Sequence, residues 1–370
     1  MRPLDFRALS RGLAKIAVEL RQRASQQPLI RATSERLRAA TEGGDWVRRR
    51  RDSALELYVL RAQTATGHEV ADHIASVVRK RLARLGQTKN FEAAADPIEA
   101  LHDLRVASRR LRALVDVLEP LLEPQLGRRA KKPLQKITRT VRRARDGDVQ
   151  IGILQERLRS ATSDIERIVL EDLLASASAK RKHESKLVRK QLRRVDFDEV
   201  NFTMCAILGK AMTLMPAPGA PTSQWLWGLL EPFAQATALD IPPNDGLEHA
   251  GHLHQLRIRL KKLRYALELF EPALGTAFDR LYAPVEGLQD ILGHHHDLVV
   301  LSEIMQRRRR VLERNHRDTL AQALASIEQQ LVEERHALVA EYRHQAFDFD
   351  GWRRALRGEL ELGSSQMLAH

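Results

Sequence analysis

Two short segments of the sequence carry the residue types best suited to chemistry, a histidine followed by basic side chains at fixed spacing. Residues 102–112 read HDLRVASRRLR and residues 254–264 read HQLRIRLKKLR, so the two segments align without a gap. In both, basic residues stand three, seven, eight and ten positions after the histidine, and leucines stand two and nine positions after it. Such spacing suits the binding of phosphate groups, because arginine and lysine donate charged hydrogen bonds to phosphate oxygens.

Each segment places its histidine and three of its basic residues on one side of a helix. At about 100° per residue they fall within a stripe about 80° wide, and the leucines fall on the opposite side. The two stripes consist of His102, Arg105, Arg109 and Arg112 in the first segment and of His254, Arg257, Lys261 and Arg264 in the second. Like charges at this spacing repel, whereas a solvated helix face usually mixes signs, so a bound anion is the better explanation. An acid closes each stripe, Asp116 and Glu268, and both are candidate intrahelical salt-bridge partners.

Basic residues also line one side of the helix expected after the first stripe, at residues 126–145. They are Arg128, Lys132, Lys136, Arg139 and Arg143. An acidic residue then follows each stripe, Asp146 within residues 145–149 and Asp297 within residues 289–299. We expect both acids at helix junctions, where each caps the following helix and orients a stripe arginine.

Composition limits the class of protein and its partners. The 370 residues include 61 Lys and Arg against 48 Asp and Glu, and the net charge of +13 favours a polyanionic partner such as nucleic acid, an anionic membrane or a phosphate polymer. Aromatic residues make up 5%, which weighs against single-stranded nucleic acid, because stacking needs aromatic side chains among the basic ones. The one cysteine, Cys205, excludes an internal disulfide framework and a cysteine-rich zinc module. No apolar run reaches the roughly 18–20 residues that span a bilayer, and the start lacks a secretory signal, so we expect a soluble, cytoplasmic protein without membrane contact.

Helical periodicity dominates the chain, and a proline-rich linker at residues 216–221 separates two similar series of helices. The predicted helices are 69–85, 97–118, 126–145, 148–160 and 163–193 before the linker, and 223–239, 247–270, 274–293, 295–315 and 317–346 after it. Their similar order of lengths indicates an internal repeat. We divide the chain into a helical, basic N-terminal extension (1–64), a first helical half (65–197), a second helical half (198–347) and a C-terminal tail (348–370).

The sequence resembles the CHAD domain, the conserved-histidine α-helical domain. The resemblance rests on the two stripes and on two later runs, RDGDV at residues 145–149 and LQDILG at residues 288–293. The resemblance covers residues 65–347 and implies an all-α fold of two four-helix bundles related by internal duplication, with the stripes facing a basic central groove or pore. It also implies the binding of inorganic polyphosphate, often at polyphosphate granules, with no cofactor. Residues 359–363 lack the lysine of the CYTH triphosphatase motif and lie at the wrong end of the chain, so we expect a stand-alone CHAD protein.

By position, the resemblance assigns the polyphosphate contacts to the two stripes and to Arg145, and the basic side of the helix at 126–145 extends them. The candidate polyphosphate-binding residues are His102, Arg105, Arg109, Arg112, Lys132, Lys136, Arg139, Arg143, Arg145, His254, Arg257, Lys261 and Arg264. Each stripe spans about 15 Å, which is long enough for several units of a flexible phosphate chain. No catalytic or metal-ligating residue is assigned.

Three other functions remain as alternatives. No glycine-rich phosphate loop, kinase signature or nucleophile elbow is present, so we expect no phosphoryl transfer or other catalysis. The imidazoles of His249, His252 and His254, or of residues 294–296, suit zinc, nickel or copper, although three consecutive histidines on a helix point in three directions. Non-specific nucleic-acid binding would use the same arginines, and we expect it to be weak because no motif for reading bases is present. The sequence does not indicate an oligomeric state.

Overall fold

The computed structural model describes residues 69–88, 94, 97–214, 222–241, 250–345 and 347–367. All regular elements in these ranges are helices and none is a strand, which confirms the predicted all-α class. The N-terminal extension 1–64 and the proline-rich linker lie outside the described residues. None of the helices within the described ranges has the length and apolar character needed to cross a bilayer.

The part of the chain before the linker folds into long helices with defined starts. They are α4 (Glu69–Thr88), α5 (Pro97–Leu118), the 3₁₀ helix η2 (Glu119–Leu121), α6 (Pro124–Ser160), α7 (Asp164–Leu192) and α8 (Phe197–Thr213). Ser163 caps α7 by accepting a hydrogen bond from the amide of Glu166, and Asp196 caps α8 in the same way from the amide of Glu199. α5 begins with a proline, which is favoured there because the first helical turn leaves its N–H groups unused.

The part of the chain after the linker forms a second series of helices. They are α9 (Ser223–Leu239), α10 (Ala250–Leu269), α11 (Glu271–Leu274), the 3₁₀ helix η4 (Gly275–Ala277), α12 (Phe278–Arg314), α13 (Asp318–His344) and α14 (Phe349–Met367). The sharp turn between α11 and α12 passes through Gly275, whose φ of 50° lies in the left-handed region that favours glycine. α9 spans the predicted residues 223–239.

Two helix breaks predicted from the sequence are wrong. α6 and α12 are single helices of 37 residues each, and they continue through the junctions expected near Asp146 and Asp297. Neither acid therefore caps a helix. Gly147, which lies at the first predicted break, allows α7 to approach, because a Cβ atom at this position would lie 3.3 Å from the Arg181 side chain. A glycine inside a helix costs about 1 kcal/mol relative to alanine, and packing along these long helices outweighs that cost.

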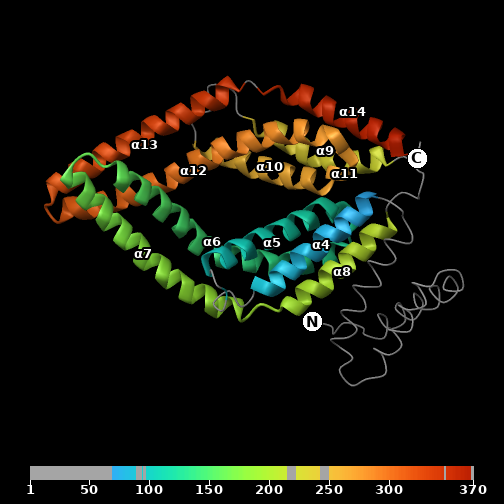
Figure 1. Cartoon of the computed structure of the whole chain (residues 1–370), viewed down its shortest axis with the longest axis horizontal. Coiled ribbons are helices and arrows are strands. Elements are labelled where there is room, and N and C mark those ends of the chain that lie inside the picture. Colours follow the sequence, from blue (N-terminus) through green and yellow to red (C-terminus); the bar gives the residue numbers. More distant parts are fainter. Residues whose placement is uncertain are drawn as a thin grey trace, which may run out of the picture.

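Two apolar clusters hold the helices together, and each draws on both halves of the chain. The larger joins α4, α5, α8 and the start of α6 to α9, α10, α14 and the start of α12. The smaller joins the later parts of α6 and α12 to α7 and α13. α6 and α12 therefore run from one cluster into the other (Figure 1). Residues 145–152 of α6 and 293–297 of α12 belong to neither cluster, so Asp146 and Asp297 lie between the two cores.

Two segments differ from the predicted division of the chain. Residues 348–370, expected as a C-terminal tail, include α14, which packs against α9 and α11. Its residues Phe349, Trp352 and Leu356 are buried, and the Trp352 indole N–H donates to the carbonyl of Leu281 at 2.9 Å. α8, which the sequence placed at the start of the second half, packs against α4 and α6 of the first.

Candidate anion-binding site

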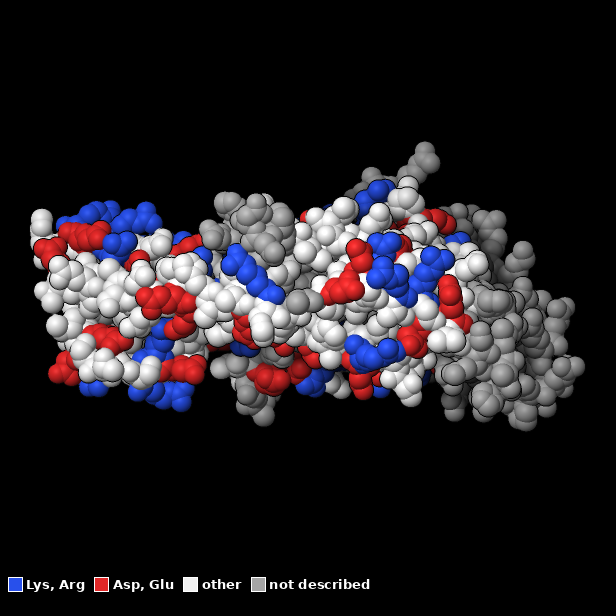
Figure 2. All heavy atoms as spheres, turned by 90° about the horizontal axis from the view of Figure 1, so that it is seen from above, with Lys and Arg blue, Asp and Glu red and all other residues white. Residues whose placement is uncertain are grey.

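The excess of positive charge is not evident on every face of the molecule. Seen from the side of α13 and α14, basic and acidic side chains are interspersed among uncharged ones (Figure 2). Several exposed arginines pair with an acid one turn away, such as Arg307 with Glu303 and Arg357 with Glu361. Such mixed charge is ordinary for solvated helices, so this face offers no reason to expect a polyanion.

Basic side chains gather instead between α5 and α10, the helices that carry the two predicted stripes. The two helices contact each other, α6 packs against α5, and α12 packs against α10. The guanidinium of Arg109 on α5 lies 5.6 Å from the ring centroid of Tyr265 on α10. The interacting side chains, called the cationic cluster below, are Arg105, Arg109, Arg142, Arg145, His254, Arg257, Lys261 and His296, with the acids Asp146 and Asp297.

Two arginines of the cationic cluster have buried donors without a partner. The Nε–H groups of Arg105 and Arg257 are shielded from solvent, and within the described residues neither donates a hydrogen bond to a protein atom. The two residues hold the same position in their stripes, three residues after the histidine. An unsatisfied buried donor costs roughly 1–3 kcal/mol, and more when it is charged. These two groups are therefore suited to an anion that brings oxygen acceptors between α5 and α10.

Burial and mutual repulsion lower the pKa values of the cations in the cluster. The pKa of Arg105 falls to about 10, chiefly through burial and then through the charge of Arg109. The pKa of Lys261 falls to about 7, chiefly through burial and then through the charges of Arg257 and Arg109. Lys261 is therefore about half protonated near neutral pH, and a bound anion would favour its charged form.

His254 of α10 and His296 of α12 form a pair within the cluster. Their Nδ1 atoms are 3.3 Å apart and their ring centroids are 4.7 Å apart, so one ring donates to the other. Burial, followed by the charge of Arg257, lowers the pKa of both rings, that of His296 to about 4, so both are neutral at pH 7. The sequence prediction missed His296, although it directly precedes Asp297 as Arg145 directly precedes Asp146. It also missed Arg142, which only the course of α6 past α10 brings into the cluster.

The last basic residue of each stripe lies outside the cationic cluster and is paired with an acid. The Nε atom of Arg112 is 4.0 Å from Oδ2 of Asp116, and the Nε atom of Arg264 is 3.8 Å from Oε1 of Glu268. These are the intrahelical partners that the sequence indicated. His102 lies at the start of the α5 stripe and is partly exposed. Of the predicted stripes, the structure therefore gathers five residues into the cluster, Arg105, Arg109, His254, Arg257 and Lys261, and leaves His102, Arg112 and Arg264 outside it.

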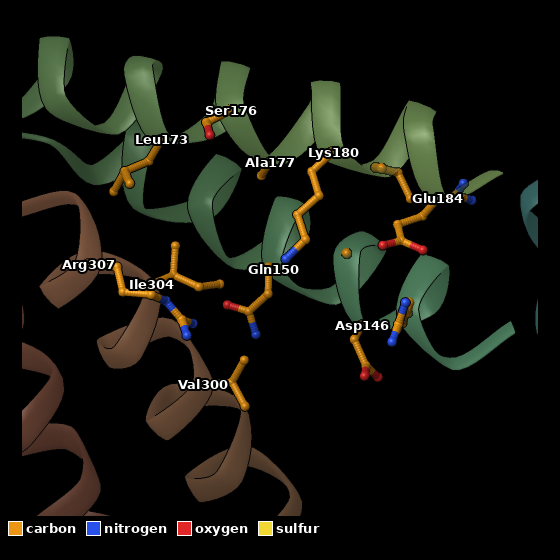
Figure 3. Close-up of a pocket in the computed structure, with 13 residues that line it drawn as sticks. Asp146, Gln150, Leu173, Ser176, Ala177, Lys180, Glu184, Val300, Ile304 and Arg307 are labelled. Atoms are coloured by element: carbon orange, nitrogen blue, oxygen red, sulfur yellow. The ribbon is translucent and has the colours of Figure 1, made fainter. Parts of the chain in front are cut away.

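The predicted residues of α6 form an exposed row that we call the α6 track. It consists of Lys132, Lys136, Arg139 and Arg143. The Nζ group of Lys136 donates to the carbonyl of Arg194 at 3.1 Å. At about 100° per residue the α6 track lies on the same face of the helix as Asp146, so it runs along the surface towards the cationic cluster. Arg143 and Asp146 also line a cavity between α6, α7 and α12 (Figure 3).

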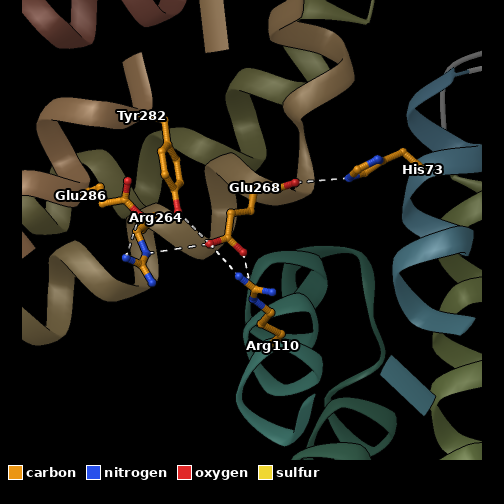
Figure 4. Close-up of polar contacts among 6 residues, drawn as sticks. All are labelled: His73, Arg110, Arg264, Glu268, Tyr282 and Glu286. Carbon is orange, nitrogen blue, oxygen red and sulfur yellow. Dashed lines mark hydrogen bonds and ion pairs between the residues drawn. The ribbon is translucent and has the colours of Figure 1, made fainter. Parts of the chain in front are cut away.

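One carboxylate, that of Glu268 on α10, joins the helices around the cluster. Its Oε2 lies 3.0 Å from Nε of Arg110 on α5, and its Oε1 accepts from the Tyr282 hydroxyl of α12 at 3.0 Å. The main-chain carbonyl of Glu268 lies 3.2 Å from Nε2 of His73, so α4, α5, α10 and α12 meet at this residue (Figure 4). Burial and the charge of Glu268 raise the pKa of Tyr282, so its hydroxyl stays protonated and donates. This network holds the two stripe helices together beside the cluster.

The candidate metal-binding histidines are spread over different surroundings. His294 is exposed, His295 is buried and His296 belongs to the cationic cluster, so the three consecutive rings point in three directions as expected. In the part of the chain that the structure describes, no three His, Cys, Asp or Glu side chains form a group that suits a metal ion. His249 lies outside the described residues.

Comparisons with known proteins agree with this arrangement of helices. A family model described as the CHAD domain matches residues 77–306, which is more than half of the chain. A search of curated proteins returned no match. Among solved structures, the chain is similar to the crystal structure of the CHAD domain from the plant Ricinus communis, with a TM-score of 0.52 and 20% sequence identity over 79% of this chain and 91% of that chain. At this identity the likeness shows a shared fold.

Proposed function

The chain belongs to the CHAD domain family, and on that premise we propose that it binds inorganic polyphosphate in the cationic cluster between α5 and α10. The observation that carries the proposal is the pair of buried Nε–H groups on Arg105 and Arg257, which have no acceptor among the described residues. Phosphate oxygens between the two helices would accept these hydrogen bonds, each contributing roughly 1.5–3 kcal/mol as a charged hydrogen bond. They would also offset the repulsion that Lys261 experiences from its neighbours.

The burial of the cluster favours a bare phosphate chain over a nucleic acid. Because the donors of Arg105 and Arg257 are shielded from solvent, phosphate must come close to α5 and α10 to reach them. Polyphosphate carries no sugars or bases, so a single strand of it can enter where a duplex is too wide. Tyr265 already contacts Arg109 and Arg264, at 5.6 Å from each guanidinium to the ring centroid, so this ring is not free to stack on a base.

We further propose that α5 and α10 are equivalent helices of an internally duplicated chain that face each other across a basic central groove. The equivalent pairs are Arg105 with Arg257, Arg109 with Lys261 and Asp146 with Asp297. The surfaces that lead to the groove are not equivalent, because the positions on α12 that correspond to the α6 track carry Ala283, Gly287, Asp290 and His294. A polyphosphate chain therefore approaches along α6.

The proposed role is binding without turnover, in the cytoplasm at polyphosphate granules. The cluster consists mainly of donors, and one of its two acids is already engaged, because Asp146 accepts a hydrogen bond from Nε of Arg142 at 3.2 Å. The sequence also lacks the phosphate loop and kinase signature that phosphoryl transfer uses. Such a site holds a polymer firmly without placing a nucleophile beside its phosphorus atoms.

Calorimetric titration at about 150 mM salt, where exposed charges are screened beyond about 8 Å, tests the proposal. Long-chain polyphosphate, duplex DNA and single-stranded RNA are compared at equal phosphate concentration. We expect polyphosphate to bind at least about tenfold more tightly than either nucleic acid, which corresponds to about 1.4 kcal/mol or more, because only its phosphates reach the buried donors. Equal affinities for the three polymers would contradict the proposal and would mean that exposed basic side chains dominate binding.

A further inference from the structure

A cavity of about 410 Å³ lies between α6, α7 and α12, next to the cationic cluster (Figure 3). One wall is apolar and consists of Leu173 and Ala177 of α7 with Val300 and Ile304 of α12. Small-molecule sites usually enclose roughly 300–1,000 Å³, so this cavity suits a compact ligand. Asp146 lines the cavity and also belongs to the cluster, so the two sites adjoin.

Basic side chains line the same cavity, and two of them lack an acidic partner. Within the described residues, Arg143 of α6 and Lys180 of α7 form no ion pair, and Arg307 of α12 has an exposed contact of 3.8 Å with Glu303. Arg181 is different, because its Nε and Nη2 atoms already donate to the carboxylate of Asp148 on α6, at 2.5 and 3.3 Å. The unpaired cations indicate that the ligand carries an anionic group such as phosphate.

Gln150 lines the cavity and offers it a hydrogen-bond acceptor. This side chain is 5% exposed, its Nε2 donates to the carbonyl of Asp297 at 3.3 Å, and its Oε1 has no partner among the described residues. Figure 3 shows the amide extending from α6 towards α12. An unsatisfied buried acceptor costs roughly 1–3 kcal/mol, and a ligand N–H group would remove that cost after a small rotation of the amide.

Two carboxylates distinguish the cavity from a site for phosphate alone. Asp146 and Glu184 line it together with the unpaired cations Arg143 and Lys180. They would repel a chain that consists only of phosphates, but they accept hydrogen bonds from hydroxyl groups. The lining therefore combines an apolar wall, an acceptor for N–H, acceptors for O–H and cations for phosphate.

We propose that this cavity binds a nucleotide, a ligand class that carries all four matching parts. The base lies against the wall formed by Leu173, Ala177, Val300 and Ile304. Its amino group donates to Oε1 of Gln150, the ribose hydroxyls donate to the carboxylates, and the phosphates lie towards Arg143 and Lys180. This site goes beyond the proposed polyphosphate groove and is separate from the buried donors of that groove.

Calorimetry with ATP tests the inference on the full chain. Ala177→Trp fills the cavity from α7, and Ala179→Trp adds the same ring at an exposed position of the same helix that does not line the cavity. We expect Ala177→Trp to lower the affinity for ATP by more than about tenfold, while Ala179→Trp leaves it within about twofold. Both variants should bind long-chain polyphosphate like the wild type, because neither touches the donors between α5 and α10.

A second variant, Lys180→Gln, shows whether a loss of affinity could come from misfolding. A second ligand, tripolyphosphate, shows whether the site recognises phosphate alone. Lys180 is exposed, so Lys180→Gln should fold normally and lower the affinity for ATP by about tenfold through the loss of a charged contact. Tripolyphosphate should bind more weakly than ATP because it lacks a base and a ribose. Unchanged ATP binding in Ala177→Trp and Lys180→Gln would overturn the inference, and so would equal affinities for ATP and tripolyphosphate. If polyphosphate fails to bind while ATP binds as expected, the proposed function fails and the nucleotide site stands.

Discussion

Replacing Arg105 and Arg257 together by alanine should lower the affinity for long-chain polyphosphate by at least about 100-fold. The expectation follows from two buried Nε–H donors without a protein partner, each of which contributes roughly 1.5–3 kcal/mol when a phosphate oxygen accepts it. The measurement is calorimetric titration at about 150 mM salt, where long-range attraction between exposed charges is weak. The variant should remain folded. Among the described residues, neither arginine forms an ion pair with an acid, so the change removes two buried charges and breaks no ion pair.

The matched control removes the same charge from the exposed α6 track. Lys132→Ala combined with Arg139→Ala should lower the affinity by less than about tenfold, since exposed ion pairs contribute about 0–1 kcal/mol each. It should also reduce the dependence of binding on salt concentration. Equal losses in the two double variants would mean that affinity follows net charge, and the assignment of the ligand to the cluster would then be wrong.

Polyphosphate binding should take up a proton above neutral pH and weaken as the pH rises. Lys261 has a pKa of about 7 in the unliganded protein, lowered first by burial and then by Arg257, Arg109 and Arg105, with Asp297 acting in the opposite direction. A phosphate chain beside the amine would raise that pKa, so above pH 7 binding must add a proton to Lys261. We therefore expect the affinity to fall by about fivefold between pH 7 and pH 8. Titration in two buffers of different ionisation enthalpy would show the proton uptake directly.

Two substitutions at Lys261 separate this effect from a general loss of charge. Lys261→Arg keeps the charge at all these pH values, so its affinity should be nearly independent of pH between 7 and 8. Lys261→Met should stabilise the unliganded protein by several kcal/mol at pH 7, because it removes a cation whose charged form the fold disfavours and whose pKa is lowered from 10.5 to about 7. A fall in affinity with pH that persists in Lys261→Arg would assign the proton to another group.

The sign of the stability effect follows from the pKa of Lys261 in the two states. Its folded value of about 7 lies below the ordinary value of 10.5, so between these pH values the unfolded chain binds more protons. The free energy of unfolding should therefore rise with pH across this window, and the destabilisation should be fully present below pH 7. Urea denaturation at pH 6.5 and pH 9.5 should show this rise in the wild type and a smaller one in Lys261→Met.

Helical periodicity predicted the elements that carry the site, but not their connections in space. The stripes of α5 and α10 follow from residue spacing alone, because each helix must bury its leucines and expose the opposite side. The sequence could not show that Arg142 and His296 join them, since α6 and α12 reach the cluster only through tertiary packing. Spacing did indicate Asp116 and Glu268 as the partners of Arg112 and Arg264, and the structure confirms both contacts.

The two helix breaks and the C-terminal tail predicted from the sequence differ from the structure for a common physical reason. Gly147 and Gly293 have weak intrinsic helix propensity, yet α6 and α12 continue through them because packing on both sides stabilises the helices. In the segment taken for a tail, Phe349, Trp352 and Leu356 recur at helical spacing and are buried. In both places, packing against neighbouring helices decides the structure more strongly than the helix propensity of the local residues.

The central claim is that polyphosphate lies between α5 and α10, within reach of Arg105 and Arg257. The most direct measurement is a crystal structure of the protein with a polyphosphate chain bound. We expect phosphate oxygens within about 2.7–3.2 Å of both Nε atoms, the range of ordinary hydrogen bonds, with Lys261 contacting the same chain. Density for polyphosphate only along exposed side chains such as those of the α6 track, with the cluster unchanged and both Nε–H groups still without acceptors, would contradict the claim.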